Sequence, residues 1–317
     1  MQGFDTTAVV FERPRHLALS QVSLAPPGDD DCVVDIEWSG ISTGTERLLW
    51  LGQMPDFPGM GYPLVPGYES VGRVVSGGER SGLRAGDRVF VPGSRGFTDV
   101  RGLFGGAAAR VVAPAERLVP LNQTLAEEGV LLALAATAYH AIALDGPTRL
   151  PQLVVGHGVL GRLIARLVRA LDGATPTVWE TNPARRAGEF DYPVIDPTAD
   201  QRVDYREACD VSGSSEIINS LVPHLARGSQ IVLAGFYQRP VSFDFPPAFM
   251  REVGIRIAAE WRPDDLQQVL RLLDEGRLSL DGLITHCESP RDAAAAYQTA
   301  FEDADCLKMI LDWRRSE

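Results

Sequence analysis

Cysteine is scarce in this chain, and its few occurrences are scattered. The 317 residues contain four cysteines, Cys32, Cys209, Cys287 and Cys306, and no two of them form a C-x-x-C pair. A zinc knuckle and a disulfide framework both require cysteines at short, regular spacings. Neither kind of site is expected, and we interpret these cysteines as small core or surface residues.

Long apolar runs and clustered positive charge are lacking as well. The longest nearly uncharged run, residues 130–144, is too short and too polar to span a bilayer and is typical of a buried helix. The first residues lack the basic and apolar segments of a signal peptide. A net charge of −12 argues against a nucleic-acid surface. We expect a cytoplasmic protein without a transmembrane segment and without a nucleic-acid partner.

A glycine pattern is the clearest positive signal. The apolar residues 153–155 precede Gly156, Gly158 and Gly161, which are spaced G-x-G-x-x-G. This pattern predicts a strand that turns into a helix over the pyrophosphate of a dinucleotide. The first glycine permits the turn, the second admits the phosphate and the third lets the helix pack closely, while the helix N-terminus offers N–H groups to the anion. Residues 160–171 have the periodicity of an amphipathic helix.

An acidic residue follows at the distance that a dinucleotide site requires. Glu180 ends a second predicted strand, residues 176–180, and lies 19 positions after Gly161. A carboxylate there binds the ribose hydroxyls of NAD and repels the extra phosphate of NADP. Arg185 and Arg186 could bind that phosphate, but Glu180 opposes it, so NAD is the predicted cofactor. The alternative is a glycine-rich turn in an unrelated α/β domain.

The predicted secondary structure differs between the first part of the chain and the rest. Residues 7–120 alternate short β-branched runs with Gly and Pro clusters, which predicts a mostly antiparallel β domain. From about residue 125 helices alternate with strands, and six such strands predict a doubly wound parallel sheet. The last helices and strand, residues 264–311, are expected to return to the first domain. The fold class is therefore α/β.

Several motifs together resemble the medium-chain dehydrogenase/reductase superfamily. They are Gly67-Tyr68-Glu69, Ala85-Gly86-Asp87-Arg88-Val89, Gly105-Gly106, Thr137-Ala138-Tyr139-His140-Ala141, the glycine triplet and Leu307-Lys308-Met309-Ile310-Leu311. The resemblance covers nearly the whole chain. It implies a GroES-like β domain from residues 1–134 and 262–317 and a Rossmann domain from residues 135–261.

The chain departs from the zinc enzymes of that superfamily. Those enzymes carry a cysteine in the loop that matches residues 40–46 and a histidine before the glutamate of G-H-E, whereas this chain has Ser42 or Thr43 and Tyr68. A hydroxyl and a phenol are poor zinc ligands. The four-cysteine lobe is also missing, and residues 93–104 take its place. We therefore predict an enzyme without a metal.

Longer strings are similar to the bacteriochlorophyllide a dehydrogenases of bacteriochlorophyll biosynthesis, a branch of this superfamily. They include WSGISTGTERLLW, FPGMGYPLVPGYESVGRV, LLALAATAYHA, VWETNPARR and FPPAFMRE. The resemblance implies NAD-dependent oxidation of the 3-(1-hydroxyethyl) group of a bacteriochlorophyllide, a magnesium tetrapyrrole, to 3-acetyl. An alternative location is the periphery of photosynthetic membranes. By analogy with relatives of the superfamily, a homodimer is expected.

Without a metal, a side chain or water must take the hydroxyl proton. Tyr68 is the first candidate because it replaces a zinc ligand, although its ring could simply fill space. Glu69 could orient a group or accept a proton, or be structural. Ser42 and Thr43 could bind the substrate oxygen or cap a turn. His140 could relay a proton, but a buried and satisfied histidine is the favoured interpretation.

Binding residues complete the hypothesis. The residues expected at the cofactor are Gly156, His157, Gly158, Val159, Leu160, Gly161, Glu180, Thr181, Arg185, Ser212, Gly213, Gly235 and Phe236, with Thr137 placed at the nicotinamide by the resemblance. The residues expected to wall a flat apolar pocket are Trp50, Met54, Phe57, Met60, Tyr62 and Tyr237, with ordinary core packing as the alternative. Two rival functions remain: a zinc-independent quinone or enone reductase, and a non-catalytic pigment carrier that keeps the nucleotide fold.

Overall fold

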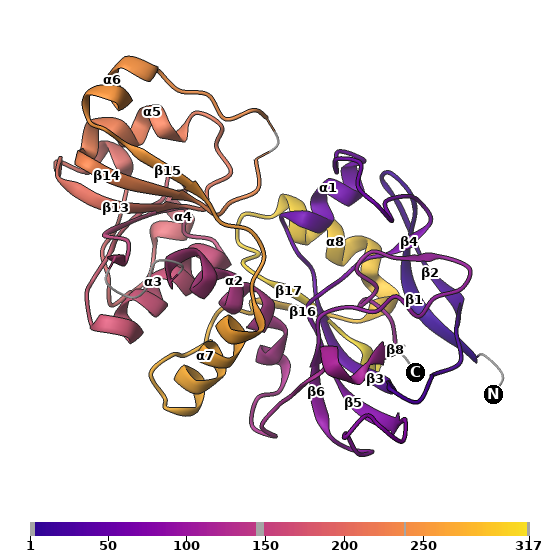
Figure 1. Ribbon diagram of the computed structural model, residues 1–317. Helices are drawn as coiled ribbons and strands as arrows, with labels where there is room; N and C mark the ends of the chain where they lie inside the picture. Colours follow the sequence, from indigo (N-terminus) through magenta and orange to yellow (C-terminus); the bar gives the residue numbers. More distant parts are fainter. Residues whose placement is uncertain (1–3, 144–148, 238, 316–317) are drawn as a thin grey trace. The chain divides into compact units, whose positions relative to one another are not determined.

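The computed structural model describes residues 4–143, 149–237 and 239–315 and divides the chain into two compact units (Figure 1). The first unit comprises Met1–Ala133 and Asp281–Glu317, and the second comprises Leu134–Leu280. Each unit is described by itself.

The first unit is built on two mostly antiparallel sheets. One has the strand order β2-β1-β4-β7, and the other has the order β16-β17-β3-β5-β6-β9, with β8 also paired to β3. The strands are β1 (Phe4–Arg13), β2 (His16–Leu24), β3 (Asp31–Gly40), β4 (Leu64–Val65), β5 (Ser70–Gly77), β6 (Arg88–Val91), β7 (Arg101–Gly102), β8 (Arg110–Pro114), β9 (Val119–Pro120), β16 (His286–Glu288) and β17 (Met309–Asp312), and the helices are α1 (Thr45–Leu51) and α8 (Ala293–Glu302).

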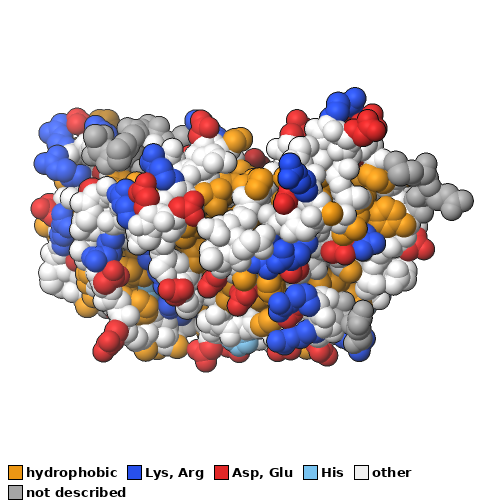
Figure 2. Space-filling view, turned by 90° about the horizontal axis from the view of Figure 1, so that it is seen from below, with side chains coloured by type: hydrophobic (Ala, Val, Ile, Leu, Met, Phe, Trp, Pro, Cys, Tyr) orange, Lys and Arg blue, Asp and Glu red, His pale blue; other side chains and the backbone are white. Residues whose placement is uncertain are grey.

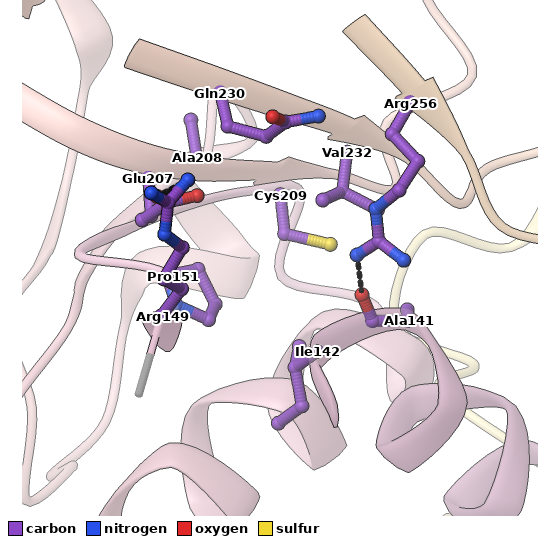
Figure 3. Close-up of a pocket in the computed structure, with 10 residues that line it drawn as sticks. All are labelled: Ala141, Ile142, Arg149, Pro151, Glu207, Ala208, Cys209, Gln230, Val232 and Arg256. Atoms are coloured by element: carbon purple, nitrogen blue, oxygen red, sulfur yellow. Dashed lines mark hydrogen bonds and ion pairs between the residues drawn. The ribbon is translucent and has the colours of Figure 1, made fainter. Parts of the chain in front are cut away.

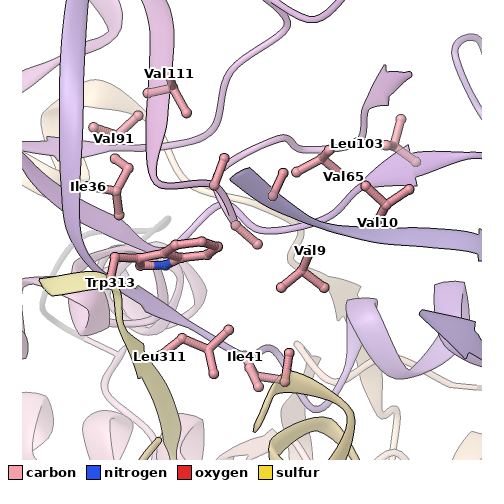
Figure 4. Packing of buried hydrophobic residues seen from close by; sticks show 14 of the residues in the cluster. Val9, Val10, Ile36, Ile41, Val65, Val91, Leu103, Val111, Leu311 and Trp313 are labelled. Carbon is pink, nitrogen blue, oxygen red and sulfur yellow. The ribbon is translucent and has the colours of Figure 1, made fainter. Parts of the chain in front are cut away.

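A single apolar core joins the two ends of this unit's sequence. Strand β17 pairs antiparallel with β3, with Ile310 opposite Gly40. Trp313, just after β17, is buried among aliphatic side chains from β1, β3 and β8 (Figure 4), and its indole N–H donates to Ser39 Oγ at 2.8 Å. Burying such a large side chain beside β3 favours the return of this segment. The expected return to the first domain is therefore observed for the part of the chain from Asp281 onward.

The second unit contains a six-stranded parallel sheet in the order β12-β11-β10-β13-β14-β15. Its strands are β10 (Leu153–Val155), β11 (Thr177–Trp179), β12 (Val194–Ile195), β13 (Tyr205–Asp210), β14 (Leu225–Leu233) and β15 (Gly254–Ile257), and its helices are α2 (Leu132–Ala143), α3 (Val159–Asp172), α4 (Pro183–Arg186), α5 (Ile217–Leu221), α6 (Phe245–Met250) and α7 (Pro263–Asp274). Helices α5 and α6 lie on one side of the sheet and α2 and α3 on the other (Figure 1). This doubly wound order confirms the predicted fold class.

The boundary between the units differs from the predicted one. Helix α7, expected in the first domain, belongs to the second unit, which continues to Leu280. His140 on α2 and Asp265 on α7 are joined at 2.8 Å, and Arg166 on α3 donates to the Ser279 carbonyl at 2.9 Å. An amphipathic helix has the same sequence pattern whichever core it covers, so the sequence could not assign α7. Of the predicted helix at residues 130–144, α2 covers Leu132–Ala143, Val130 and Leu131 end a preceding 3-10 helix, and Leu144 lies outside the described residues.

One face of the molecule shows how charged side chains are distributed. On the face in Figure 2, acidic and basic side chains are interspersed with apolar ones. Within the described residues, none of the helices has the length and apolar character needed to cross a membrane.

Candidate functional site

The turn between β10 and α3 has the geometry that the glycine pattern predicts. Gly156 has φ +99°, which glycine adopts without strain. A Cβ on Gly161 would lie 1.8 Å from the Gly156 carbonyl oxygen, so only glycine fits there. A Cβ on Gly158 would meet nothing within 4 Å. The space in front of the 14-residue helix α3 is thus open, as a pyrophosphate seat requires.

Glu180, directly after β11, is held beside this turn by main-chain groups. Its Oε2 accepts a hydrogen bond from the His157 N–H at 3.0 Å, and its Oε1 accepts one from the Asn182 N–H at 2.8 Å. The side chain is buried. Each carboxylate oxygen retains a further lone pair. The arrangement therefore fits a ribose whose hydroxyls donate to Glu180.

His157, predicted at the cofactor, turns its ring away into the protein. Nδ1 is 2.8 Å from the Arg185 carbonyl oxygen and Nε2 is 3.1 Å from the Tyr192 hydroxyl. A carbonyl only accepts, so Nδ1 carries the hydrogen and Nε2 accepts from Tyr192. Burial lowers the pKa of His157 to about 4. The ring is therefore a neutral structural group, and only the main chain of this residue faces Glu180.

The two arginines after Glu180 have different partners. Arg186 Nη1 donates to the carbonyl oxygens of Glu180 and Thr181, at 2.8 and 2.7 Å, and to Asp196 Oδ2 at 3.0 Å. Arg186 therefore braces the turn between β11 and α4. Arg185 contributes its carbonyl to His157, and Thr181 is exposed.

Two loops at the carboxyl ends of β13 and β14 approach each other closely. A Cβ on Gly235 would lie 3.2 Å from the Gly213 nitrogen. Buried Asp210 accepts from the Ser212 N–H at 3.1 Å and from the Tyr237 hydroxyl. Burial raises the pKa of both Asp210 and Tyr237. Asp210 was missed by the sequence analysis, and the phenol of Tyr237, a predicted pocket residue, is turned onto it.

The remaining predicted residues of this unit lie on or near the same elements. Thr137 on α2 is half-buried, Ser212 is exposed, and Phe236 is 50% exposed. His140, a proton-relay candidate, is buried against Asp265. This is the satisfied arrangement that the sequence favoured for it.

In the first unit, Tyr68 is hydrogen-bonded to Ser42, one of the two residues expected at the position of the zinc enzymes' cysteine. The Tyr68 hydroxyl is 2.8 Å from Ser42 Oγ, and the Thr45 side chain also hydrogen-bonds to Tyr68. The Tyr68 ring meets Phe104 edge-on at a centroid distance of 5.4 Å. Burial, and then the charge of Glu69, hold the pKa of Tyr68 well above its usual range. The side chain is therefore a neutral phenol within a group of three hydroxyls.

Behind Tyr68 lies a buried ion pair that the sequence analysis missed. The Lys308 ammonium contacts Glu69 Oε2 and donates to the Ile41 carbonyl oxygen at 3.0 Å. Both side chains are almost completely buried. A Cβ on Gly40 would lie 2.4 Å from Glu69 Oε2 and 3.0 Å from Lys308 Cε. One signal was available: Lys308 is the single lysine among the 30 lysine and arginine residues of the chain.

A second buried carboxyl, Glu46, lies next to this pair. Its Oε1 accepts from the Ser42 N–H at 3.1 Å, and its Oε2 is 2.7 Å from the donating hydroxyl of Tyr297 on α8. Burial raises the pKa of Glu46 to about 8, with a further contribution from the charge of Glu69. Glu46 therefore holds a proton at neutral pH.

The predicted pocket segment packs mainly on its own unit. Trp50, Met54, Met60 and Tyr62 are partly buried against the apolar core, and Phe57 is 37% exposed. Thr43 is exposed. A role of these residues in substrate binding stays a prediction. Among the described residues, no three His, Cys, Asp or Glu side chains gather as metal ligands would.

A small pocket occurs elsewhere in the second unit (Figure 3). Arg256 donates to the Ala141 carbonyl oxygen at 2.8 Å across it, and Arg149 is 3.8 Å from Glu207. Its lining residues are Ala141, Ile142, Arg149, Pro151, Glu207, Ala208, Cys209, Gln230, Val232 and Arg256. None of the predicted cofactor residues is among them, so this pocket is separate from the glycine turn.

Known proteins similar to this chain decide its family. Residues 28–123 match the alcohol dehydrogenase GroES-like domain. The chain is 56% identical to the 2-desacetyl-2-hydroxyethyl bacteriochlorophyllide A dehydrogenase of Rhodobacter capsulatus, over 98% of this chain and 99% of that protein. It is 57% identical to the enzyme of the same name from Cereibacter sphaeroides, over 98% of each chain. The chain belongs to this family of bacteriochlorophyllide dehydrogenases. It is an alcohol-type oxidoreductase of the medium-chain dehydrogenase/reductase superfamily.

Solved structures share the fold of these bacteriochlorophyllide dehydrogenases at low identity. An alcohol dehydrogenase from Escherichia coli CFT073 complexed with NADH has a TM-score of 0.81 at 20% identity, and covers 98% of this chain and 99% of its own. A dehydrogenase from Sinorhizobium meliloti 1021 bound to NADP has the same score, identity and coverage. At this identity they establish the fold alone.

The raised pKa of Glu46 predicts a pH effect on stability. The unfolded chain loses this proton near the ordinary pKa of glutamate, whereas the folded chain keeps it to about pH 8. The group therefore lowers the free energy of unfolding as pH rises from about 5 to 8, by about 1.4 kcal/mol per pH unit at most. Glu46→Gln mimics the protonated group and should remove this slope, measured by urea unfolding at several pH values. Glu302→Gln, an exposed change on α8, should leave the slope unchanged; an unchanged slope in Glu46→Gln would show that Glu46 is ionised.

Proposed function

We propose that this chain oxidises the hydroxyethyl substituent of a bacteriochlorophyllide to an acetyl group, with NAD as the hydride acceptor, in bacteriochlorophyll biosynthesis. The observation that carries the proposal is identity of 56% and 57%, over nearly the full length, to two enzymes named for that substrate. Both matches cover 98% of this chain, so the comparison includes both of its units.

The second unit fits a nicotinamide dinucleotide. The open space at Gly158 admits a pyrophosphate, whose charge the first N–H groups of α3 would stabilise. Glu180 would accept hydrogen bonds from both ribose hydroxyls and repel a 2′-phosphate, which favours NAD over NADP. NAD supplies the hydride acceptor when bound. The loops at Gly213 and Gly235, with Phe236, follow the carboxyl ends of β13 and β14, where open α/β sheets bind ligands.

The first unit offers a route for the hydroxyl proton that needs no metal. Because its pKa is raised, Tyr68 does not act as a phenolate. It accepts the substrate proton as it passes its own proton to Ser42 or Thr45, to which it is hydrogen-bonded. The accepting hydroxyl gives up its own proton in turn, and the partly buried Thr45 would pass it to water, so one proton is released for each alcohol oxidised. Positioned proton transfer of this kind contributes roughly 100- to 10,000-fold. The hydroxyls at the zinc-ligand positions bond to each other, which supports zinc-independent chemistry.

We also propose that the protein is a homodimer formed through the β15 edge of the second unit. β15 is the last strand of its sheet, with Ile255 39% and Ile257 76% exposed. Phe245 and Phe249 on the neighbouring α6 are 64% and 63% exposed. Apolar side chains beside an unpaired strand edge favour pairing with a second copy. Light scattering tests this: twice the chain's mass supports it, and a monomer excludes it.

The reaction is followed by absorbance with purified protein, NAD, the hydroxyethyl bacteriochlorophyllide and a chelator. The expected result is a red shift of the pigment's long-wavelength band together with formation of NADH. Pigment binding without turnover would favour a carrier. Absence of both binding and turnover, with NADPH-dependent reduction of a quinone or enone, would favour a reductase.

In this assay Tyr68→Phe should lower turnover at least tenfold, because the ring remains but the hydroxyl that joins substrate to Ser42 is lost. NADH affinity should stay near that of the wild type, since Tyr68 belongs to the first unit and the glycine turn to the second. Tyr205→Phe serves as the matched control because its hydroxyl bonds Asp200 and none of the three hydroxyls around Tyr68. Wild-type rates for Tyr68→Phe at every pH would make Tyr68 a space-filling residue.

Cofactor choice is tested at Glu180. Glu180→Ala should reduce the preference for NADH over NADPH by about tenfold, as loss of about 1.4 kcal/mol of discrimination implies. Dissociation constants from nicotinamide fluorescence measure it without turnover. Glu189→Ala removes an exposed acid from the following loop and should leave the preference unchanged. Equal constants in Glu180→Ala and wild type would remove Glu180 from the ribose site.

A further inference from the structure

The single lysine of the chain occupies an unusual position. Lys308 precedes β17 and is 2% exposed, whereas the other basic side chains of the chain are arginines. Its ammonium contacts Glu69 Oε2 and the Ile41 carbonyl oxygen. An ammonium removed from water requires a counter-charge, and Glu69 supplies it.

Arginine could not replace Lys308 without rearrangement. Lys308 Cε would lie 3.0 Å from a Cβ on Gly40, so the lysine stem already fills the space beside β3. A guanidinium is larger than an ammonium and presents a planar fork of donors. Here the acceptors are one carboxylate oxygen and one carbonyl oxygen. The site therefore accommodates a compact point charge.

The charge of Glu69 acts on the groups around the candidate catalytic residue. Its other oxygen, Oε1, is buried and has no hydrogen-bond partner among the described residues. Besides Lys308, the titratable groups that face it are Tyr68 beside it in the chain, Glu46 on α1 and Tyr297 on α8. The negative charge of Glu69 raises the pKa of each of these three groups. In all three, burial makes the largest contribution to the shift and the charge of Glu69 makes a smaller one.

We propose that Lys308 is a positioning residue of the reaction: it keeps Glu69 ionised behind Tyr68, and this fixed negative charge promotes oxidation of the substrate alcohol. Departure of the hydride to NAD leaves positive charge on the hydroxyl carbon and its oxygen. A carboxylate held close by stabilises that positive charge, while the hydroxyl proton passes to the Tyr68 oxygen as the phenol's own proton passes to Ser42. This inference rests on the proposed function.

Two variants separate charge from packing. Burial raises the pKa of the Glu69 carboxyl, and the charge and hydrogen bond of Lys308 oppose that rise. Lys308→Met removes the opposing cation, so the pKa of Glu69 rises further and its protonated form is favoured at neutral pH. The double variant Lys308→Met/Glu69→Gln removes both charges with little change of volume and avoids the unpaired buried charge that can prevent folding. Thermal unfolding and NADH binding by fluorescence are measured first, on the full chain. The double variant should fold, and NADH affinity should stay within about twofold, because the cofactor residues lie in the second unit.

Turnover of the hydroxyethyl pigment is then followed from pH 6 to pH 10. Both variants should be at least tenfold slower than wild type at pH 7, the scale of losing one preorganised electrostatic contact. Lys308→Met should recover as pH rises from about 8 to 10, because Glu69 can ionise again, while the double variant should not. Glu46, whose pKa of about 8 includes a contribution from Glu69, titrates in the same range. Both profiles are therefore repeated with Glu46→Gln added to each variant, and the difference between them should remain.

Wild-type turnover in the double variant would overturn the proposal and make the pair a packing element. The proposal would also be overturned by equal pH profiles of the two variants. If Lys308→Met does not fold, turnover of the double variant alone decides. Wild-type protein that binds NADH but does not turn over the pigment at any pH would instead refute the proposed function.

Discussion

The buried ion pair between Glu69 and Lys308 constrains the first unit more than any other contact. It joins residues 239 positions apart in the sequence and requires a glycine at position 40. The two charges are out of water, so each is tolerable only while the other is present. Strand β17 must therefore lie in register beside β3, next to the two separate loops that carry Ser42 and Tyr68. The candidate chemistry and the completion of the sheet depend on the same interaction.

The candidate cofactor site of the second unit is built by different means. Around the glycine turn the fixed donors are main-chain N–H groups, and the one acid, Glu180, is itself oriented by the main chain of His157 and Asn182. The His157 ring is anchored on the Arg185 carbonyl, and Arg186 braces the neighbouring turn between β11 and α4. Main-chain recognition depends on backbone path, which explains why glycines dominate it. The first unit instead depends on buried side chains, whose protonation is set by burial and neighbouring charge.

Features that depend on local pattern could be predicted from the sequence. The parallel sheet, the glycine turn and the acid at residue 180 are all specified by spacing within about 30 residues. The sequence did not predict the hydrogen bond between Ser42 and Tyr68. It indicated only that Ser42 or Thr43, and Tyr68, stand where zinc enzymes have their ligands. Lys308, Thr45, Asp210 and Tyr297 were missed, because their partners lie on other elements and no periodicity marks them. The placement of α7 was wrong for a related reason: apolar spacing shows that a helix covers a core but does not identify the core. The only sequence feature that singled out Lys308 was that it is the one lysine of the chain.

The division of the chain into one continuous and one discontinuous unit has a consequence for its synthesis. The second unit, Leu134–Leu280, is a single stretch that can fold once it has left the ribosome. The first unit lacks β16, β17 and α8 until much later, although its other strands are made first. Until residue 308 emerges, Glu69 has no cation and the β3 edge has no β17 to cover it. The earliest-made half of the protein is therefore the last to mature, and its exposed strand edge is where a nascent chain would need protection from aggregation.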